Sequence, residues 1–182
     1  MNNSGSITEF DIFSMRIVWK QQIRTLKKKG VRVDGIGLQC HVELNSNKPT
    51  IEQLEETIIN FHKEGLQVHI TELDVDVLPN AWRYRDQHIN DLPERVGELN
   101  PYKDGLPERV GTLLASRYEE LFRLFLKHQD KIPRVSLWGT SDDETWRNYR
   151  PVVGRTNYPL LFDSRQRPKK AYFALHKLGT DS

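Results

Sequence analysis

The sequence predicts an α/β fold with parallel strands. Helical and extended patterns alternate along the chain, several predicted helices end at a glycine, and the short apolar runs between them end in polar residues. The chain has 182 residues, of which 37% are hydrophobic, as is typical of globular proteins. Length and composition together favour one domain.

The composition argues against several classes of protein. The 27 Lys and Arg residues nearly balance 25 Asp and Glu residues, so the formal charge of +2 does not favour a dedicated nucleic-acid or membrane-surface protein. A single cysteine, Cys40, excludes an intrachain disulfide framework and a cysteine-rich zinc site. No apolar run reaches the roughly 20 residues that span a bilayer. The first fifteen residues lack the basic and apolar regions of a secretory signal, so none is expected there.

The N-terminal half predicts two helices, each followed by a strand. Residues 14–29 carry apolar side chains at helical spacing and end at a glycine, which predicts an amphipathic helix. Residues 31–42 form a short apolar run typical of a buried strand. Thr50 and Gln53 make a capping box that opens the second helix, and residues 66–77 form the second strand.

The C-terminal half predicts a long loop and then a third strand between two helices. Residues 78–106 show no sustained period, and a connection of this length favours a site-forming loop. A helix then runs from Pro107 to the break at Pro133. Residues 134–139 follow as a strand, and residues 168–178 as the last helix.

Polar side chains gather at the ends of the first two predicted strands. Gln39 and His41 are two residues apart, so the alternation of a strand places them on one face. Glu72 and Asp74 share a face by the same rule. His69 has the opposite parity and is predicted to point away from Glu72.

Two tryptophans add flat aromatic surface near these strand ends. Trp138 ends the third strand, and Trp146 lies in the loop beyond it. Carboxylates, an imidazole and indoles suit carbohydrate chemistry, because indole faces stack on sugars and carboxylates stabilise oxocarbenium-like charge. Taken singly, each residue also fits a structural role as a solvated strand end, a packed histidine or a rim aromatic. Their occurrence at consecutive strand ends favours a site.

Five segments of the chain are more specific than these patterns. They are DGIGLQCH (34–41), ITELDVDVLP (70–79), NPYKDGLPERV (100–110), VSLWGTSDDETW (135–146) and GRTNYPLLFD (154–163). In this order they resemble glycoside hydrolase family 10, the endo-1,4-β-xylanases. The resemblance implies a partial TIM (β/α)8 barrel, with its C-terminal βα units, strands six to eight, in this chain. It divides the chain into an atypical N-terminal segment, 1–13, and the C-terminal part of a catalytic domain, 14–182.

The resemblance also implies a reaction and its catalytic residues. The family hydrolyses the β-1,4-xylosidic bonds of xylan with retention of configuration, using one Glu as nucleophile and another as acid/base. By its place in the TELD motif, Glu72 resembles the nucleophile. His41 resembles the residue that orients this carboxylate, with Asp74 on the other side of the imidazole.

Further residues resemble the family's sugar-binding positions. Gln39 resembles a polar contact to the glycone sugar, and Trp138 and Trp146 resemble the indoles that wall the subsites nearest the cleavage point. The implied partner is xylan or a xylo-oligosaccharide. No metal or cofactor is implied, because this hydrolysis needs only carboxyl groups and water. Most members of the family are secreted, so an extracellular location is expected for the full-length family, and the location of this chain is left open.

Two departures from the family pattern concern the site. Cys40 stands where the family usually has Gly, and we expect a packing adjustment there. The family carries its acid/base in an Asn-Glu pair, and the chain contains no such pair, so the acid/base is unassigned. Residues 7–11, ITEFD, echo residues 70–74, ITELD, and coincidence is the favoured explanation. Glu43 is a further carboxylate near the site, without a role in the family pattern.

These departures leave three interpretations open. In the first, the chain holds the nucleophile half of a xylanase site and alone has little or no activity on xylan, because general acid catalysis contributes about 10²–10⁴-fold. In the second, it is a catalytically incompetent fragment whose Trp138 and Trp146 retain xylan binding. In the third, two copies associate through open sheet edges.

Overall fold

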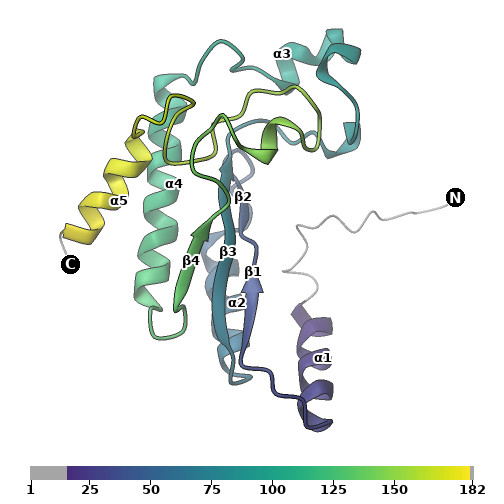
Figure 1. Cartoon of the computed structure of the whole chain (residues 1–182), viewed down its shortest axis with the longest axis vertical. Coiled ribbons are helices and arrows are strands. Elements are labelled where there is room, and N and C mark those ends of the chain that lie inside the picture. Colours follow the sequence, from purple (N-terminus) through teal and green to yellow (C-terminus); the bar gives the residue numbers. More distant parts are fainter. Residues whose placement is uncertain (1–15, 181–182) are drawn as a thin grey trace, which may run out of the picture.

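The computed structural model describes residues 16–180. Its strands lie parallel and alternate with helices, which confirms the predicted α/β architecture (Figure 1). The helices are α1 (Arg16–Lys28), α2 (Ile51–His62), α3 (Val96–Leu99), α4 (Glu108–Lys127) and α5 (Lys170–Thr180). The strands are β1 (Gly35–Leu38), β2 (His41–Glu43), β3 (Gln67–Asp76) and β4 (Arg134–Leu137).

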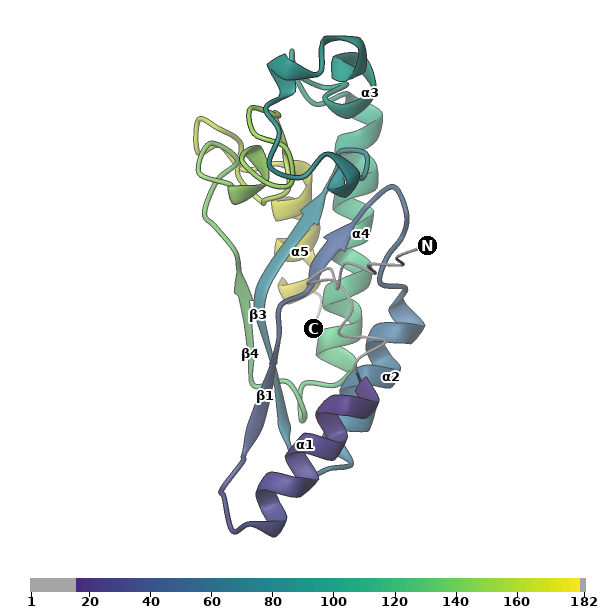
Figure 2. The ribbon, with the colours of Figure 1, turned by 90° about the vertical axis from the view of Figure 1, so that its right-hand side faces the viewer.

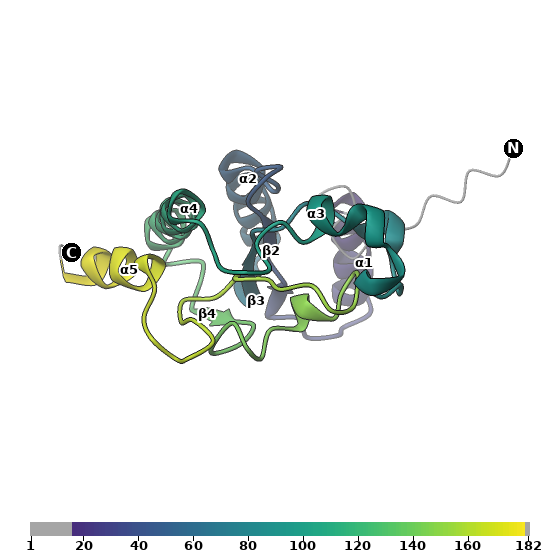
Figure 3. The same ribbon diagram turned by 90° about the horizontal axis from the view of Figure 1, so that it is seen from above.

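Strand β3 is the centre of the sheet. β1 and β2 pair with it in parallel along one edge, and β4 pairs with it in parallel along the other (Figure 1). Helices α1, α2 and α4 lie on one face of this sheet (Figure 2). Within residues 16–180, no helix covers the opposite face (Figures 2 and 3). The described part of the chain is therefore an open, partial α/β fold rather than a closed barrel.

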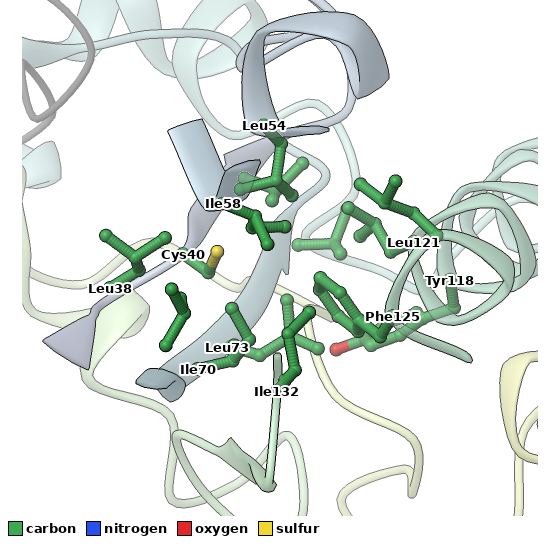
Figure 4. Packing of buried hydrophobic residues seen from close by; sticks show 14 of the residues in the cluster. Leu38, Cys40, Leu54, Ile58, Ile70, Leu73, Tyr118, Leu121, Phe125 and Ile132 are labelled. Carbon is green, nitrogen blue, oxygen red and sulfur yellow. The ribbon is translucent and has the colours of Figure 1, made fainter. Parts of the chain in front are cut away.

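The hydrophobic core lies between the sheet and helices α2 and α4. Ile58 of α2 and Leu121 of α4 meet Ile70 and Leu73 of β3 there, and all four side chains are fully buried (Figure 4). Helix α2 begins with the predicted capping box, because the Thr50 side chain accepts from the Gln53 backbone and the Gln53 side chain accepts from the Thr50 backbone.

A bulge in β3 corrects one prediction. The pairing of β3 with β4 shifts register between Ile70 and Leu73, where β3 holds one extra residue. Ile70 and Leu73 are three residues apart, yet both point into the same core (Figure 4). Because the bulge reverses the alternation, His69 lies on the same face as Glu72. The prediction that His69 points away from Glu72 is wrong.

The strand predicted over residues 31–42 is two strands, and this is a second correction. Gln39 and Cys40 lie between β1 and β2, so strand alternation does not relate Gln39 to His41. Cys40 has a φ of 63°, in the left-handed region that favours glycine. Its side chain points into the core, beside Leu38 (Figure 4). The irregular backbone at Cys40 thus redirects the chain just before His41.

The predicted loop 78–106 contains short helical turns that periodicity could not reveal. They are 3₁₀ turns at Trp82–Tyr84, Ile89–Asp91 and Pro93–Arg95, followed by α3. These turns enclose a small second core formed by Ala81, Ile89, Leu99 and Val152. In the part of the chain that the structure describes, no helix is both long and apolar enough to cross a membrane.

Candidate active site

Strand pairing brings the three predicted catalytic residues together. His41 opens β2 and lies opposite Asp74 of β3 in the parallel register. The His41 Nδ1 atom is 3.0 Å from Asp74 Oδ1, and its Nε2 atom is 3.2 Å from Glu72 Oε2. Both carboxylates face the same imidazole, so their shared face is as predicted. The imidazole therefore bridges two carboxylates.

This bridge requires two protons. An ionised carboxylate only accepts hydrogen bonds, and a neutral imidazole carries one N–H. If Nδ1–H of His41 donates to Asp74, the contact between Nε2 and Glu72 needs a second proton, either on the imidazole or on the carboxyl group. The contact fixes the orientation of the Glu72 carboxyl group.

Asp74 is ionised and fully enclosed. The indole Nε1 of Trp146 donates to its Oδ2 atom over 2.7 Å, and an Arg147 Nη2 donates to its Oδ1 atom over 2.8 Å. Burial alone would raise the pKa of Asp74, but the Arg147 charge and the His41 hydrogen bond outweigh it and hold that pKa below its ordinary value. Asp74 is therefore a fixed negative charge behind the imidazole.

A second buried carboxylate extends this network, and the sequence reasoning missed it. Asp76 accepts from Arg147 Nη1 over 3.1 Å, from Asn157 Nδ2 over 2.7 Å and from the Leu78 backbone over 2.9 Å. Burial lowers the pKa of Arg147, but Asp74 and Asp76 outweigh it and raise the pKa. The period-two spacing of Asp76 from Asp74 was a usable signal for its orientation.

The two predicted tryptophans have different environments. Trp146 is half-buried, and its ring centroid lies 4.8 Å from that of His41 at an interplanar angle of 49°. The Trp146 indole is thus held against the catalytic candidates. Trp138 follows β4 and is 46% exposed, and its backbone N–H donates to the Leu73 carbonyl. Its side chain remains open to solvent at the strand end.

Gln39 approaches the site through its backbone. Its carbonyl oxygen accepts from the Glu72 N–H over 2.9 Å, and its side chain is half-buried. Glu43 is engaged elsewhere, because its carboxylate accepts from Ser46 Oγ over 2.5 Å and from Asn80 Nδ2 over 2.8 Å. The ITEFD segment, residues 7–11, lies outside the described residues. Within residues 16–180, no group of acidic, histidine or cysteine side chains has the arrangement of a metal site.

Comparisons with known proteins all point to the same family. The model of glycosyl hydrolase family 10 matches residues 7–178. The chain is 37% identical over 151 residues to an endo-1,4-β-xylanase of Geobacillus stearothermophilus, covering 83% of this chain and 40% of that protein. It is 35% identical over 174 residues to endo-1,4-β-xylanase A of Xylanibacter ruminicola, covering 93% of this chain and 47% of that protein. The chain thus spans less than half the length of these relatives.

Solved structures agree with this result. A family 10 endoxylanase retrieved from a sugarcane soil metagenome is 45% identical, with a TM-score of 0.79 over 90% of this chain and 44% of that one. A family 10 xylanase of Thermobacillus composti is 34% identical, with a TM-score of 0.73, and the match covers 90% of this chain and 48% of that one. A mutant structure in complex with xylotriose is also 34% identical, with a TM-score of 0.69, over 86% of this chain and 43% of that one.

Proposed function

The chain belongs to glycosyl hydrolase family 10, and from this membership we propose that it carries the nucleophile half of a retaining endo-1,4-β-xylanase site. The family and the partial barrel expected from the sequence are confirmed by the family match and the structural neighbours. The division into residues 1–13 and the catalytic part, residues 14–182, stays a prediction. We also propose xylan as the substrate and, because xylan is a polymer outside the cell, an extracellular site of action.

The observation that supports Glu72 as the nucleophile is the difference in exposure between the two carboxylates. The Glu72 side chain is 22% exposed, whereas that of Asp74 is fully buried. A nucleophile must reach the anomeric carbon of a sugar, and only Glu72 of this pair is open to one. Asp74 acts instead through His41, as a fixed charge that orients the imidazole.

His41 prepares the Glu72 carboxylate for attack. Its contact with Oε2 leaves Oε1 to form a bond with the anomeric carbon, while the bond from that carbon to the leaving oxygen breaks. The product of this step is a covalent glycosyl-enzyme, and the leaving oxygen takes a proton from an acid. Water then hydrolyses the glycosyl-enzyme and regenerates the Glu72 carboxylate.

The acid is the part of the site that this chain leaves unassigned. A retaining glycosidase places its second carboxyl group about 5–5.5 Å from the nucleophile. Glu43 does not fit this role, because Ser46 and Asn80 hold its carboxylate. We therefore expect little or no hydrolysis of xylan by the chain alone, since its leaving group needs protonation.

Gln39, Trp138 and Trp146 are the proposed contacts to the sugar. The exposed Trp138 indole offers a face for stacking, and Trp146 lies against His41. A relative of this chain has been solved with xylotriose, which supports a xylo-oligosaccharide as the ligand.

An aryl β-xylobioside with a reactive leaving group tests the proposal. Such a leaving group needs little acid assistance, so the wild-type chain should release about one equivalent of phenol in a burst and then stall. Glu72→Gln should abolish the burst. Glu43→Gln is the matched control, because it removes a nearby carboxylate without touching Glu72, and it should keep the burst. A burst that survives Glu72→Gln would refute the assignment.

The second candidate is a catalytically incompetent fragment that binds xylan. The exposed Trp138 indole favours it, because stacking needs no catalytic carboxylate. A folded wild-type chain without any burst, but with xylan binding that is lost in Trp138→Ala, would support this candidate over the first.

A further inference from the structure

One loop carries both of the indoles that we propose as contacts to the sugar. Asp142 lies midway between Trp138 and Trp146 in the sequence. Trp138 follows β4 and is 46% exposed, whereas the Trp146 indole is fixed by its donation to Asp74. The position of one indole relative to the other therefore depends on how the residues between them are held.

Asp142 is held through both its backbone and its side chain. Its N–H donates to the Phe162 carbonyl over 3.1 Å, and its carbonyl accepts from Asn148 Nδ2 over 3.3 Å. The carboxylate oxygen Oδ1 accepts from the Leu160 N–H over 3.0 Å, and Oδ2 accepts from Lys169 Nζ over 2.7 Å. The Asp142 side chain is buried, so these contacts take the place of water.

The ammonium group of Lys169 joins Asp142 to a second segment of the chain. It also donates to the carbonyl of Tyr158 over 2.9 Å and to that of Leu160 over 2.7 Å. An ammonium group has three N–H donors, so these three oxygens use all of them. Because Lys169 directly precedes α5, its side chain links the loop between the indoles, residues 158–160 and the start of α5.

Leu160 connects Lys169 to the other end of the loop. The Leu160 side chain is fully buried and packs against Gly139, where an added Cβ atom would lie only 2.8 Å from Leu160 Cδ1. Gly139 directly follows Trp138 in the sequence. A shift of Leu160 would therefore move the backbone beside the exposed indole.

The cost of burying this ion pair indicates that its role is geometric. Burial raises the pKa of Asp142 to about 6, although the charge and the hydrogen bond of Lys169 lower it. Burial likewise lowers the pKa of Lys169. A buried ion pair stabilises a fold little compared with apolar groups of similar volume. What the pair supplies is a fixed set of distances between the segments that it joins.

We propose that Lys169 is a positioning residue that sets Trp138 relative to Trp146 for sugar binding. Lys169 acts through Asp142 and Leu160 and does not itself contact the sugar. The proposal rests on the proposed function, because it takes the two indoles as contacts to xylan. With Lys169 in place, both indoles are ordered before the sugar arrives, so binding does not have to order them.

Two adjacent lysines make a matched pair of variants. The Lys169 side chain is 12% exposed, whereas that of Lys170 is 49% exposed and pairs with Glu108 at the surface. Lys169→Met alone would leave the Asp142 charge buried and unpaired, so it is combined with Asp142→Asn. The amide oxygen of this double variant can still accept from the Leu160 N–H. Lys170→Met is the control.

The first measurement is the affinity for xylotriose, determined by titration calorimetry. The double variant should bind xylotriose about tenfold more weakly than the wild-type chain, because binding must then order a mobile indole. Lys170→Met should bind within about twofold of the wild-type chain, because it removes only a surface ion pair.

The second measurement reports the indoles themselves and separates positioning from a general loss of stability. Fluorine NMR is recorded on chains labelled with 5-fluorotryptophan, and Trp138→Phe and Trp146→Phe assign the two resonances. The double variant should shift or broaden the Trp138 resonance. The resonance of Trp19, on the distant helix α1, should stay unchanged.

Four results would overturn the inference: wild-type affinity in the double variant, an unchanged Trp138 resonance, equal losses of affinity in the double variant and Lys170→Met, or a double variant that does not fold. A wild-type chain that does not bind xylotriose, with a Trp138 resonance that moves in the double variant, would keep Lys169 as the residue that positions Trp138. That result would refute the proposed contacts to xylan instead, so the two failures are distinguishable.

Discussion

Arg147 is the residue on which the buried charges of the site depend. Its side chain is fully buried, and its guanidinium group contacts both Asp74 and Asp76. A buried ion pair stabilises little compared with well-packed apolar groups, but removal of one partner leaves an uncompensated charge. Arg147 therefore matters to the fold as much as to the orientation of His41.

Arg147→Met should lower the free energy of unfolding by about 3–5 kcal/mol, because it leaves two buried carboxylates without their cation. Urea denaturation measures this change. Arg123→Met is the control, since Arg123 is exposed and its ion pair with Glu119 contributes about 0.3–0.5 kcal/mol at most. Equal destabilisation by the two substitutions would contradict the role given to Arg147.

Asp74 gives the stability of the chain a definite pH dependence. Its pKa is lower in the folded chain than the value of about 3.9 expected for an unfolded one. The unfolded chain then binds more protons in acid, so the Asp74 contribution is present above about pH 4 and is lost as the pH falls through the folded pKa. Thermal unfolding between about pH 5 and pH 3 should show a steeper loss for wild type than for Asp74→Asn. Parallel losses in the two proteins would contradict this cause.

Sequence alone could predict the site residues that share a strand but not those joined by tertiary contacts. Alternation related Glu72 and Asp74 correctly, because no register shift separates Leu73 from Asp74, whereas it failed for His69, which lies before the bulge. Arg147 lies 73 residues from Asp74 along the chain. No local pattern could link the two, because their contact depends on how the loop after β4 folds over the sheet.

At the scale of elements, two backbone irregularities shape the site. The bulge in β3 lies immediately before Leu73, and the break at Cys40 lies between β1 and β2. The bulge lies beside Glu72, and the break lies directly before His41. The positive φ of Cys40 also gives a physical reason for the glycine that the family usually has at this position.

This conformation predicts that Cys40→Gly is more stable than Cys40→Ala by about 1 kcal/mol, because only Ala keeps a Cβ atom in the left-handed region. Both substitutions remove the thiol, so the difference between their free energies of unfolding reports the effect of the Cβ atom on the backbone. Ala115→Gly in α4 serves as the opposite control and should destabilise by about 1 kcal/mol. A higher urea midpoint of unfolding for Cys40→Ala than for Cys40→Gly would show that the backbone at residue 40 is not strained.

The longer helices were largely predictable, because capping residues and the spacing of apolar residues determine where they form. The capping box at Thr50 fixed the start of α2, and apolar periodicity located α4. The segment 78–106 was not predictable, because its 3₁₀ turns are three residues long and too short to show a period. The strand break at Cys40 was hidden for a similar reason, since a single residue causes it.

At the scale of the whole molecule, the described residues form an open sheet and only part of the barrel. Membership of the family therefore does not by itself imply that this chain is active. The chain matches 44% and 48% of two related xylanase structures and contains β3, which carries Glu72, and β2, which begins at His41. Glu72, the proposed nucleophile, lies beside His41 on this part of the fold, and the Trp146 ring lies against His41. A complete retaining site also needs a second carboxyl group about 5–5.5 Å from the first.

The central claim is that Glu72 is a working nucleophile in this partial barrel. The most direct measurement is intact-protein mass spectrometry after incubation with a 2-fluoro-xylobioside that has a reactive leaving group. A single covalent adduct, mapped to Glu72 and absent from Glu72→Gln, is the predicted result. A cooperatively folded chain that forms no adduct, or an adduct that persists in Glu72→Gln, would contradict the claim.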